Sequence, residues 1–346
     1  MYSAYNAAMA EVTQASTRVR CIDWLRGLAV VNMIQWHAAC LLRPGSDKST
    51  LGWLSGLVAP SFIFAAGFAV ALTMVRASGD PAARKRRAVR SLQRIAEVLV
   101  VALVLKWVTR GAQDWWKLDI LTTIALSLLA SWPVMVAFAS RPRVVAGVSL
   151  TMAVALFVVS PHVPDAKWGI AAGSSDFAPT PWAAYVFLGA FCGALASMGI
   201  RAFGGSLVAV VGLGAVFRFA TSPWLLTNMG ERLMLTGGLA LALLWIERDA
   251  VRHRAALNWP PFSWLETVGT NALTAYVVHI WLLYVNTPVV KFSCWGWWGE
   301  KLSWAQYGAV VVGLWFVAWG ASVVWPKATA AVSARLPWGK PKPRAA

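Results

Sequence analysis

Long apolar segments are the feature that most constrains what this chain can fold into. The first, residues 20–42 (RCIDWLRGLAVVNMIQWHAACLL), is long enough to cross a bilayer. Further apolar runs follow at about 51–75, 95–109, 118–139, 144–160, 181–200, 205–220, 230–246, 263–285 and 304–325. Because lipid leaves backbone groups unsatisfied except in helices and closed barrels, the sequence predicts an all-α, polytopic transmembrane helical bundle of about ten spans.

The composition agrees with a membrane protein rather than with a soluble chain of 346 residues. Hydrophobic residues make up 58% of the chain, 22 residues are tryptophan, and the mean hydropathy is +0.59. The net charge of +17 could suggest a nucleic-acid partner, but positive residues of membrane proteins collect on the cytoplasmic side whatever the partner is. We therefore expect no nucleic acid and interpret the charge as a topology signal.

The distribution of Lys and Arg predicts that both termini are cytoplasmic. The densest positive segment, RASGDPAARKRRAVRSLQR, follows the second apolar run and assigns that loop to the cytoplasm. With this threading the cytoplasmic segments hold about twenty Lys and Arg, and the outer loops hold about eight. The predicted organisation is a cytoplasmic segment at 1–20 without a cleavable signal peptide, a transmembrane domain at 21–326 and a basic cytoplasmic tail at 327–346.

The first apolar segment carries Asp23, Arg26 and His37. An ionisable residue within a membrane span is costly and is by default a functional hypothesis. At roughly 100° per residue, the step of eleven from Arg26 to His37 returns to nearly the same helix face. That step covers roughly 16 Å along the axis, about half of the hydrocarbon core. One polar stripe is therefore predicted to span much of the membrane, with His37 past the middle.

A second intramembrane histidine, His279, lies past the middle of the span at 263–285, which also carries Asn271 and Tyr276. A neutral histidine can accept a proton near neutral pH, as a general base acting on a hydroxyl or an amine must do. Either histidine could instead form a hydrogen bond to a neighbouring helix. The two histidines at one depth, with Arg26 below them, favour a functional site.

Several other residues have two interpretations each. Asp119 opens the span at 118–139, where it could orient a histidine, bind an acceptor or simply cap the helix. The basic loop after the second span contacts anionic lipid by its charge and could also hold a phosphorylated ligand. The four cysteines lack metal-ligand spacing, so no metal site is expected. Only Cys40 and Cys294 could both face an oxidising side and form a disulfide.

Five segments together resemble one protein family. The likeness is carried, in this order, by IDWLRGLAVVNMIQWH, PSFIFAAGFAVAL, LDILTTIALSLL, FAPTPWAAYVFLGAFCGAL and NALTAYVVHIWLLY, which resemble bacterial relatives of heparan-α-glucosaminide N-acetyltransferase from about Cys21 to Trp325. The spacing of Arg26 and His37 is also similar to the arginine, ten residues, histidine pattern of the acyltransferase-three family. The eukaryotic glucosaminide enzymes look different at His37, with asparagine there and a catalytic histidine in the next loop. Here that loop, Arg43–Thr50, has no histidine, so a base for direct transfer is the better match for His37.

The resemblance implies an integral membrane acyltransferase of the bacterial inner membrane. Its donor would be cytoplasmic acetyl-CoA or another acyl-CoA, and its acceptor a hydroxyl or amino group of a sugar or glycan at the outer side. The expected catalytic residues are His37, His279 and Asp119. The expected donor contacts are Asp23, Arg26, Arg76, Arg84 and Arg87. The expected acceptor contacts are Asn271 and Tyr276. Membrane lipids and a second copy of the chain are further expected partners, and a secondary transporter or proton-coupled permease built on the same intramembrane residues is the alternative.

Overall fold

The computed structural model describes residues 18–110, 118–163, 177, 179–221, 224–253, 260–285 and 293–335. Within these residues the regular elements are helices, apart from one isolated bridge between Leu42 and Leu302. Six described helical segments are long and apolar enough to cross a membrane: Ser49–Arg76, Ile120–Ala137, Pro142–His162, Ile200–Ala220, Leu225–Asp249 and Trp304–Thr329. The prediction of an all-helical membrane protein is confirmed, whereas the count of ten spans and the cytoplasmic termini stay predictions.

The helices are, in chain order, α2 (Arg20–Ala38), the 3₁₀ turn η1 (Ala39–Leu41), α3 (Ser49–Ser55), α4 (Val58–Arg76), α5 (Pro81–Arg110), α6 (Ile120–Ala137), α7 (Pro142–Val159), the 3₁₀ turn η2 (Ser160–His162), α8 (Pro179–Ala196), α9 (Ile200–Ala220), α10 (Trp224–His253), α11 (Pro260–Thr270), α12 (Ala272–Tyr284), α13 (Cys294–Trp298) and α14 (Trp304–Arg335). Each predicted apolar run falls on a helix, except that 51–75 is divided between α3 and α4 and 263–285 between α11 and α12. The predicted N-terminal segment up to residue 17 and the predicted tail from residue 336 lie outside the described residues.

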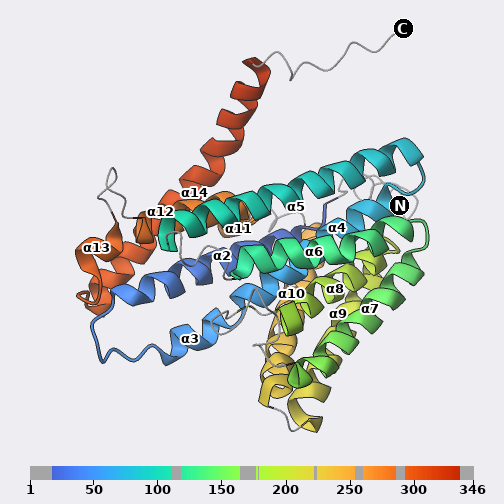
Figure 1. The fold of residues 1–346 in the computed structure, drawn as a ribbon, viewed down its shortest axis with the longest axis horizontal. Coiled ribbons are helices and arrows are strands. Elements are labelled where there is room, and N and C mark those ends of the chain that lie inside the picture. Colours follow the sequence, from blue (N-terminus) through green and yellow to red (C-terminus); the bar gives the residue numbers. More distant parts are fainter. Residues whose placement is uncertain are drawn as a thin grey trace.

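Helix α2 lies in the middle of the molecule, where it packs against α3, α4, α10, α11, α12 and α14 (Figure 1). Trp24, Leu25, Val30 and Ile34 are all buried, although they point to different sides of the helix. Burial on several sides shows that other helices of the bundle, and not only lipid, surround α2. The first apolar segment of the sequence therefore becomes the central element of the fold.

The N-terminus of α2 is capped by a residue from another helix. Its own N-cap, Val19, provides no side-chain hydrogen bond. Instead the carboxylate of Glu247 in α10 accepts hydrogen bonds from the backbone N–H groups of Arg20 and Cys21, at 3.0 and 2.9 Å. These donors have no partner within the helix, and a carboxylate at this end also complements the helix dipole. Glu247 thus ties the start of α2 to a helix 227 residues later in the chain.

Two helix pairs approach each other closely through glycines. A Cβ atom at Gly269 of α11 would overlap the carbonyl oxygen of Asp23 in α2, and one at Gly67 of α4 would overlap the carbonyl oxygen of Val186 in α8. Membrane helices gain their packing energy from such close backbone contact, because lipid gives no hydrophobic force between them. The first crossing holds α11 against α2, and it therefore positions the break that follows α11.

This break between α11 and α12 is at Asn271, whose φ of −110° and ψ of 31° are not helical. The amide of Asn271 donates to the carbonyl of Thr267 at 3.0 Å and gives α12 no side-chain cap. The adjoining residues Gly269 and Thr270 have low helix propensity, which makes an interruption here inexpensive. The stretch predicted as one span is therefore two helices, with α11 held on α2 and α12 packed against α14 and the second half of α2.

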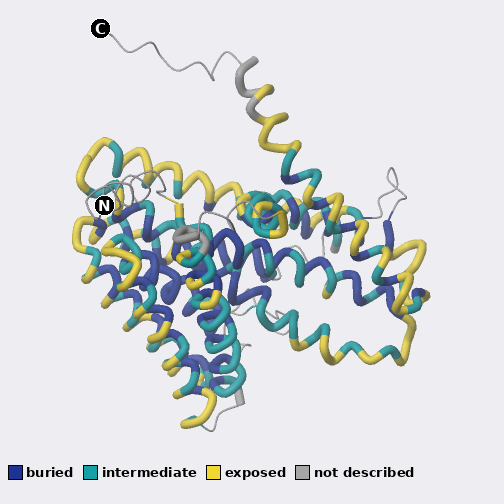
Figure 2. The backbone as a smooth tube through the Cα atoms, turned by 180° about the vertical axis from the view of Figure 1, so that it is seen from behind, coloured by how far each residue is buried: buried dark blue, intermediate teal, exposed yellow. Residues whose placement is uncertain are grey.

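Buried apolar residues form two clusters. The larger joins α4, α6, α7, α8, α9 and α10 to the first half of α2, and the smaller joins the second half of α2 to α12, α13 and α14. Figure 2 shows the buried segments in the interior and exposed residues along α5 and the C-terminal part of α14. The last turns of α14 leave the bundle, and this helix continues past the domain boundary predicted at 326 (Figure 1).

Candidate functional site

A cavity of about 1120 Å³ lies between α2, α4, α5, α6, the α11–α12 break and the part of α14 around Pro326. Its volume is above the roughly 300–1,000 Å³ of most small-molecule sites. One end, at the predicted cytoplasmic part of α5, is lined by Arg87, Arg90 and Arg94. Glu97, which pairs with Arg94 at 2.7 Å, also lines this end. The wall formed by α5 and α6 further in is mainly aliphatic, with Ile95, Val98, Val101, Ile120, Leu121, Ile124 and Leu128. The cavity follows α5 for roughly 21 Å, so it suits a long ligand with an anionic end.

The side chain of Arg26 lines this cavity from α2. Its guanidinium donates to the carbonyl oxygen of Ala65 in α4 at 2.7 Å and lies 3.5 Å from the carboxylate of Asp23. A guanidinium has five N–H donors, so these two contacts leave donors for a ligand. Met33, two turns further along α2, lines the same cavity. The face of α2 that carries Arg26 is therefore the face turned toward the cavity.

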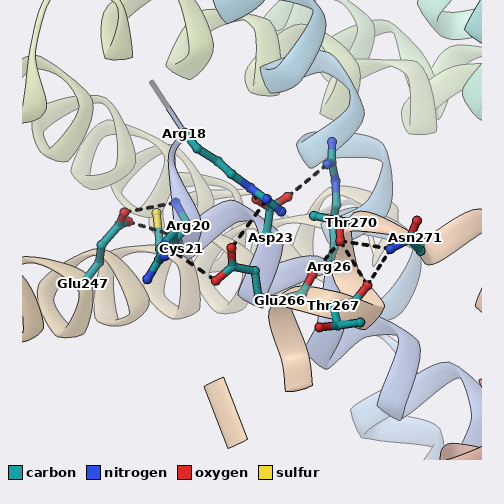
Figure 3. A network of polar contacts seen from close by, with 10 residues as sticks. All are labelled: Arg18, Arg20, Cys21, Asp23, Arg26, Glu247, Glu266, Thr267, Thr270 and Asn271. Carbon is teal, nitrogen blue, oxygen red and sulfur yellow. Dashed lines mark hydrogen bonds and ion pairs between the residues drawn. The ribbon is translucent and has the colours of Figure 1, made fainter. Parts of the chain in front are cut away.

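Asp23 belongs to a network of charges at the start of α2 (Figure 3). Its carboxylate accepts from Nε of Arg18 at 2.6 Å, while Glu266 of α11 lies 3.5 Å from Arg18 and 3.6 Å from Arg20. Charges in a poorly solvated setting need partners of opposite sign, and here every acid has at least one arginine beside it. Asp23 does not line the cavity, and its role in the structure is to hold Arg26 and Arg18 in place.

The two intramembrane histidines are in direct contact. Nδ1 of His37 lies 2.8 Å from Nε2 of His279, and their rings are nearly parallel, at 14° with centroids 5.1 Å apart. Nδ1 of His279 lies 2.9 Å from the carbonyl oxygen of Ala275. Because a carbonyl oxygen only accepts, Nδ1 of His279 carries the hydrogen, and Nε2 of the neutral ring is then an acceptor. His37 must therefore donate from Nδ1, which leaves its own Nε2 with a lone pair.

This second nitrogen of His37 has no hydrogen-bond partner among the described residues. An imidazole nitrogen with an available lone pair is what a general base requires. The turn that carries it is held from its backbone, since the hydroxyl of Tyr284 and the thiol of Cys40 both donate to the carbonyl oxygen of His37, at 2.8 and 3.0 Å. His279, in contrast, has no exposed surface. The pair therefore has an available nitrogen on His37 and a buried supporting ring on His279.

Tyr276 stands between the cavity and the histidine pair. It lines the cavity, whereas His37 and His279 are not among the described residues that do so. Its ring meets the ring of His279 edge-on, with centroids 5.4 Å apart and planes at 89°. It meets the ring of His37 at 6.4 Å and 76°. One aromatic ring thus separates the deep end of the cavity from the candidate base.

Asp119 has a structural role at the start of α6. Its carboxylate accepts from the backbone N–H and the hydroxyl of Thr122, at 2.8 and 2.6 Å, and lies 4.0 Å from the amino group of the buried Lys106. This is the N-cap geometry that the sequence left open as one interpretation. Its hydrogen bonds and ion pair within the described part of the chain do not reach either histidine. Asp119 is therefore placed as a cap and an ion-pair partner.

The other predicted site residues fall into two groups, those that line the cavity and those that do not. Arg26, Arg87, Asn271 and Tyr276 line it, and Asp23, Arg76 and Arg84 do not. Arg90 and Arg94 also line the cavity and were not among the predicted site residues, although the sequence carries a signal for them. Arg87, Arg90, Arg94, Val98 and Val101 follow one another at steps of three and four, which places them on one helix face.

Two further sequence predictions concern metals and thiols. Among the described residues there is no group of three or more His, Cys, Asp or Glu side chains that could hold a metal ion. Cys40 and Cys294 are both free thiols in the structure. The disulfide that the sequence left open between them is therefore not formed here.

Comparison with known families gives one match. Residues 18–217 match the family described as heparan-alpha-glucosaminide N-acetyltransferase, catalytic. This range covers more than half of the chain and includes Arg26 and His37, whereas Tyr276 and His279 lie beyond it. No curated protein matches the chain.

Proposed function

The chain belongs to the heparan-alpha-glucosaminide N-acetyltransferase family, and we propose on this basis that it transfers an acetyl group from acetyl-CoA, or an acyl group from another acyl-CoA, across a bacterial inner membrane. The donor binds from the cytoplasmic side. The acceptor is a hydroxyl or amino group of a sugar or glycan at the outer side. The observation that carries the proposal is a cavity with an arginine-lined mouth whose deep end is lined by Tyr276, the ring that packs on a histidine pair with an available Nε2.

The cavity offers what a CoA thioester needs along its length. Arg87, Arg90 and Arg94 at the mouth provide guanidinium groups, which pair with phosphate oxygens through two parallel hydrogen bonds. The uncharged pantetheine arm then runs along the aliphatic wall of α5 and α6, past Arg26. This path brings the thioester to Tyr276, beside the histidine pair.

In the proposed reaction His37 accepts one proton from the acceptor and later gives it to the leaving group. Nε2 of His37 takes the proton of the acceptor hydroxyl or amine while the acceptor atom attacks the thioester carbonyl. The carbon–sulfur bond then breaks, and the leaving thiolate of CoA receives the proton from His37. The products are the acylated acceptor and the CoA thiol, and the base is restored. His279 holds His37 in the tautomer with an available Nε2, the task of the orienting group in a catalytic triad.

Donor binding is the first test, because it does not require the acceptor to be identified. Acetyl-CoA and free CoA should raise the melting temperature of the purified protein in detergent, since a ligand at a hundred times its Kd stabilises the folded state by about 2.7 kcal/mol. The double variant Arg87→Glu/Arg90→Glu should lose this rise. Arg248→Glu, a charge reversal at an exposed residue of α10, should keep it.

A secondary transporter is not favoured by the family match, and the same experiment separates the two functions. A transporter for sugars or drugs would not be stabilised by acetyl-CoA. A cooperative melting curve that stays unchanged by acetyl-CoA and CoA would therefore overturn the proposed acyl transfer.

A further inference from the structure

The deep end of the cavity is closed on α2 and α12 by Met33 and Tyr276, with Phe62 of α4 beside them. One helical turn further along α2 and α12 come His37 and His279, which are not among the described lining residues. The cavity therefore ends at Met33 and Tyr276, on α2 and α12, the two helices that carry His37 and His279. A thioester that approaches His37 from this cavity has to lie against the ring of Tyr276.

The position of the Tyr276 ring is fixed by its packing. It packs edge-on against both histidine rings, an arrangement that aromatic pairs prefer. Its neighbour in sequence, Ala275, is fully buried and holds Nδ1 of His279 through its carbonyl oxygen. Moving the tyrosine ring away would therefore disturb the helical turn that positions the histidine pair.

An acyl group attached to this thioester is confined between Tyr276 and the facing wall of α5 and α6. On α5 and α6 this wall is formed by aliphatic side chains, among them Val101, Ile120 and Ile124, while Thr274 of α12 also lines the cavity. The chamber therefore offers an apolar wall to a hydrocarbon group, and its length is limited by the bulk of the tyrosine ring. Pockets of this kind discriminate by roughly 10- to 200-fold for each methylene that does not fit.

From this geometry we infer that the deep end of the cavity is an acyl-group subsite and that Tyr276 determines its length, so that acetyl and propionyl groups are accepted and medium-chain groups are excluded. This inference rests on the acyl transfer proposed above. It assigns to Tyr276 a role in donor selection, in place of the acceptor contact expected from the sequence.

The test compares acetyl-, propionyl-, butyryl- and octanoyl-CoA as donors, with release of the CoA thiol as the readout. The wild type should lose at least about tenfold in rate between propionyl- and octanoyl-CoA. Tyr276→Phe keeps the ring and should keep this profile. Tyr276→Ala removes the wall and should raise the octanoyl-to-acetyl ratio by about tenfold or more. Leu128→Ala is the matched control, because it enlarges the same cavity on α6 two turns from Ile120 without touching the wall formed by Tyr276.

If Tyr276→Ala abolishes catalytic turnover, donor binding still tests the inference. The half-saturating concentrations of octanoyl-CoA and acetyl-CoA in thermal stabilisation then report the same ratio for binding. The inference is wrong if the wild type accepts octanoyl-CoA as well as acetyl-CoA, if Tyr276→Ala leaves the ratio unchanged in both readouts, or if Leu128→Ala changes it equally. Failure of the wild type to bind or use any acyl-CoA would instead overturn the proposed function.

Discussion

The two polar ends of α2 are built in opposite ways. At its start, Asp23, Arg26 and Glu266 share several partners, so that each acid contacts at least one arginine and Arg26 also has the carbonyl of Ala65. At its far end the imidazole of His37 has one chain of hydrogen bonds among the described residues, to His279 and on to a backbone carbonyl. A shared network can redistribute its contacts when one member is lost, whereas a single chain cannot.

The two ends of α2 also differ in how far their side chains are exposed to solvent. The side chain of Arg18 is 47% exposed, so its ion pairs are screened and each contributes little on its own. His279 has no exposed surface, and the tautomer of its partner depends on it alone. We therefore expect many residues to contribute to the free energy of donor binding, whereas proton transfer should depend on one residue.

The largest expected effect is at His37. Removing a general base costs roughly 10² to 10⁴ in rate, so His37→Ala should nearly abolish CoA release in the presence of acceptor while the stabilisation by acetyl-CoA is kept. Initial rates and melting curves on the same preparation measure both. Full turnover of His37→Ala would rule out His37 as the base.

The partner histidine provides the control for this variant. In His279→Gln the amide oxygen can still accept the hydrogen of Nδ1 of His37, whereas His279→Ala removes the acceptor. His279→Gln should therefore retain more activity than His279→Ala. Equal rates for the two variants would show that the tautomer of His37 does not depend on this contact.

A smaller effect is expected at Arg26. Hydrogen bonds to a charged group contribute about 1.5–3 kcal/mol, so Arg26→Ala should weaken acetyl-CoA binding by roughly ten- to a hundredfold. Arg26→Lys should recover part of this loss, since charge remains but the planar fork does not. Arg84→Ala, in the basic segment of α5 but outside the cavity, is the control. Unchanged affinity in a folded Arg26→Ala protein would remove Arg26 from the donor site.

The smallest effect is expected at Glu247, which touches the backbone of α2 and not the cavity. Loss of a helix N-cap typically costs about 1 kcal/mol, so Glu247→Ala should lower the melting temperature modestly. Arg248→Ala, at the exposed neighbouring position on α10, should not. Identical melting curves for the two variants would mean that the cap is not a significant tie between α2 and α10.

The sequence predicts those features that depend on one helix at a time. Apolar length predicts the helices, and the period of 3.6 residues predicts that Arg26 and His37 share a face of α2. The low helix propensity of Gly269 and Thr270 is a local sign of the break at Asn271, but the contact between His37 and His279 depends on how distant helices cross, here through the glycine at 269. No local pattern carries that information, and the same holds for Glu247 as a cap of α2. For Asp119, local sequence left capping and chemistry equally open, and the hydrogen bonds to Thr122 show the cap.

Helix α2 also fixes the spacing between its functional side chains. Its 19 residues form one uninterrupted helix, so the spacing between Arg26, the proposed donor contact, and His37, the proposed base, is set by regular helix geometry and not by a flexible loop. Side chains between these two positions can vary as long as they pack. Inserting or deleting one residue there would turn His37 by about 100° away from its partner, so the number of residues in this interval is constrained more tightly than their identity.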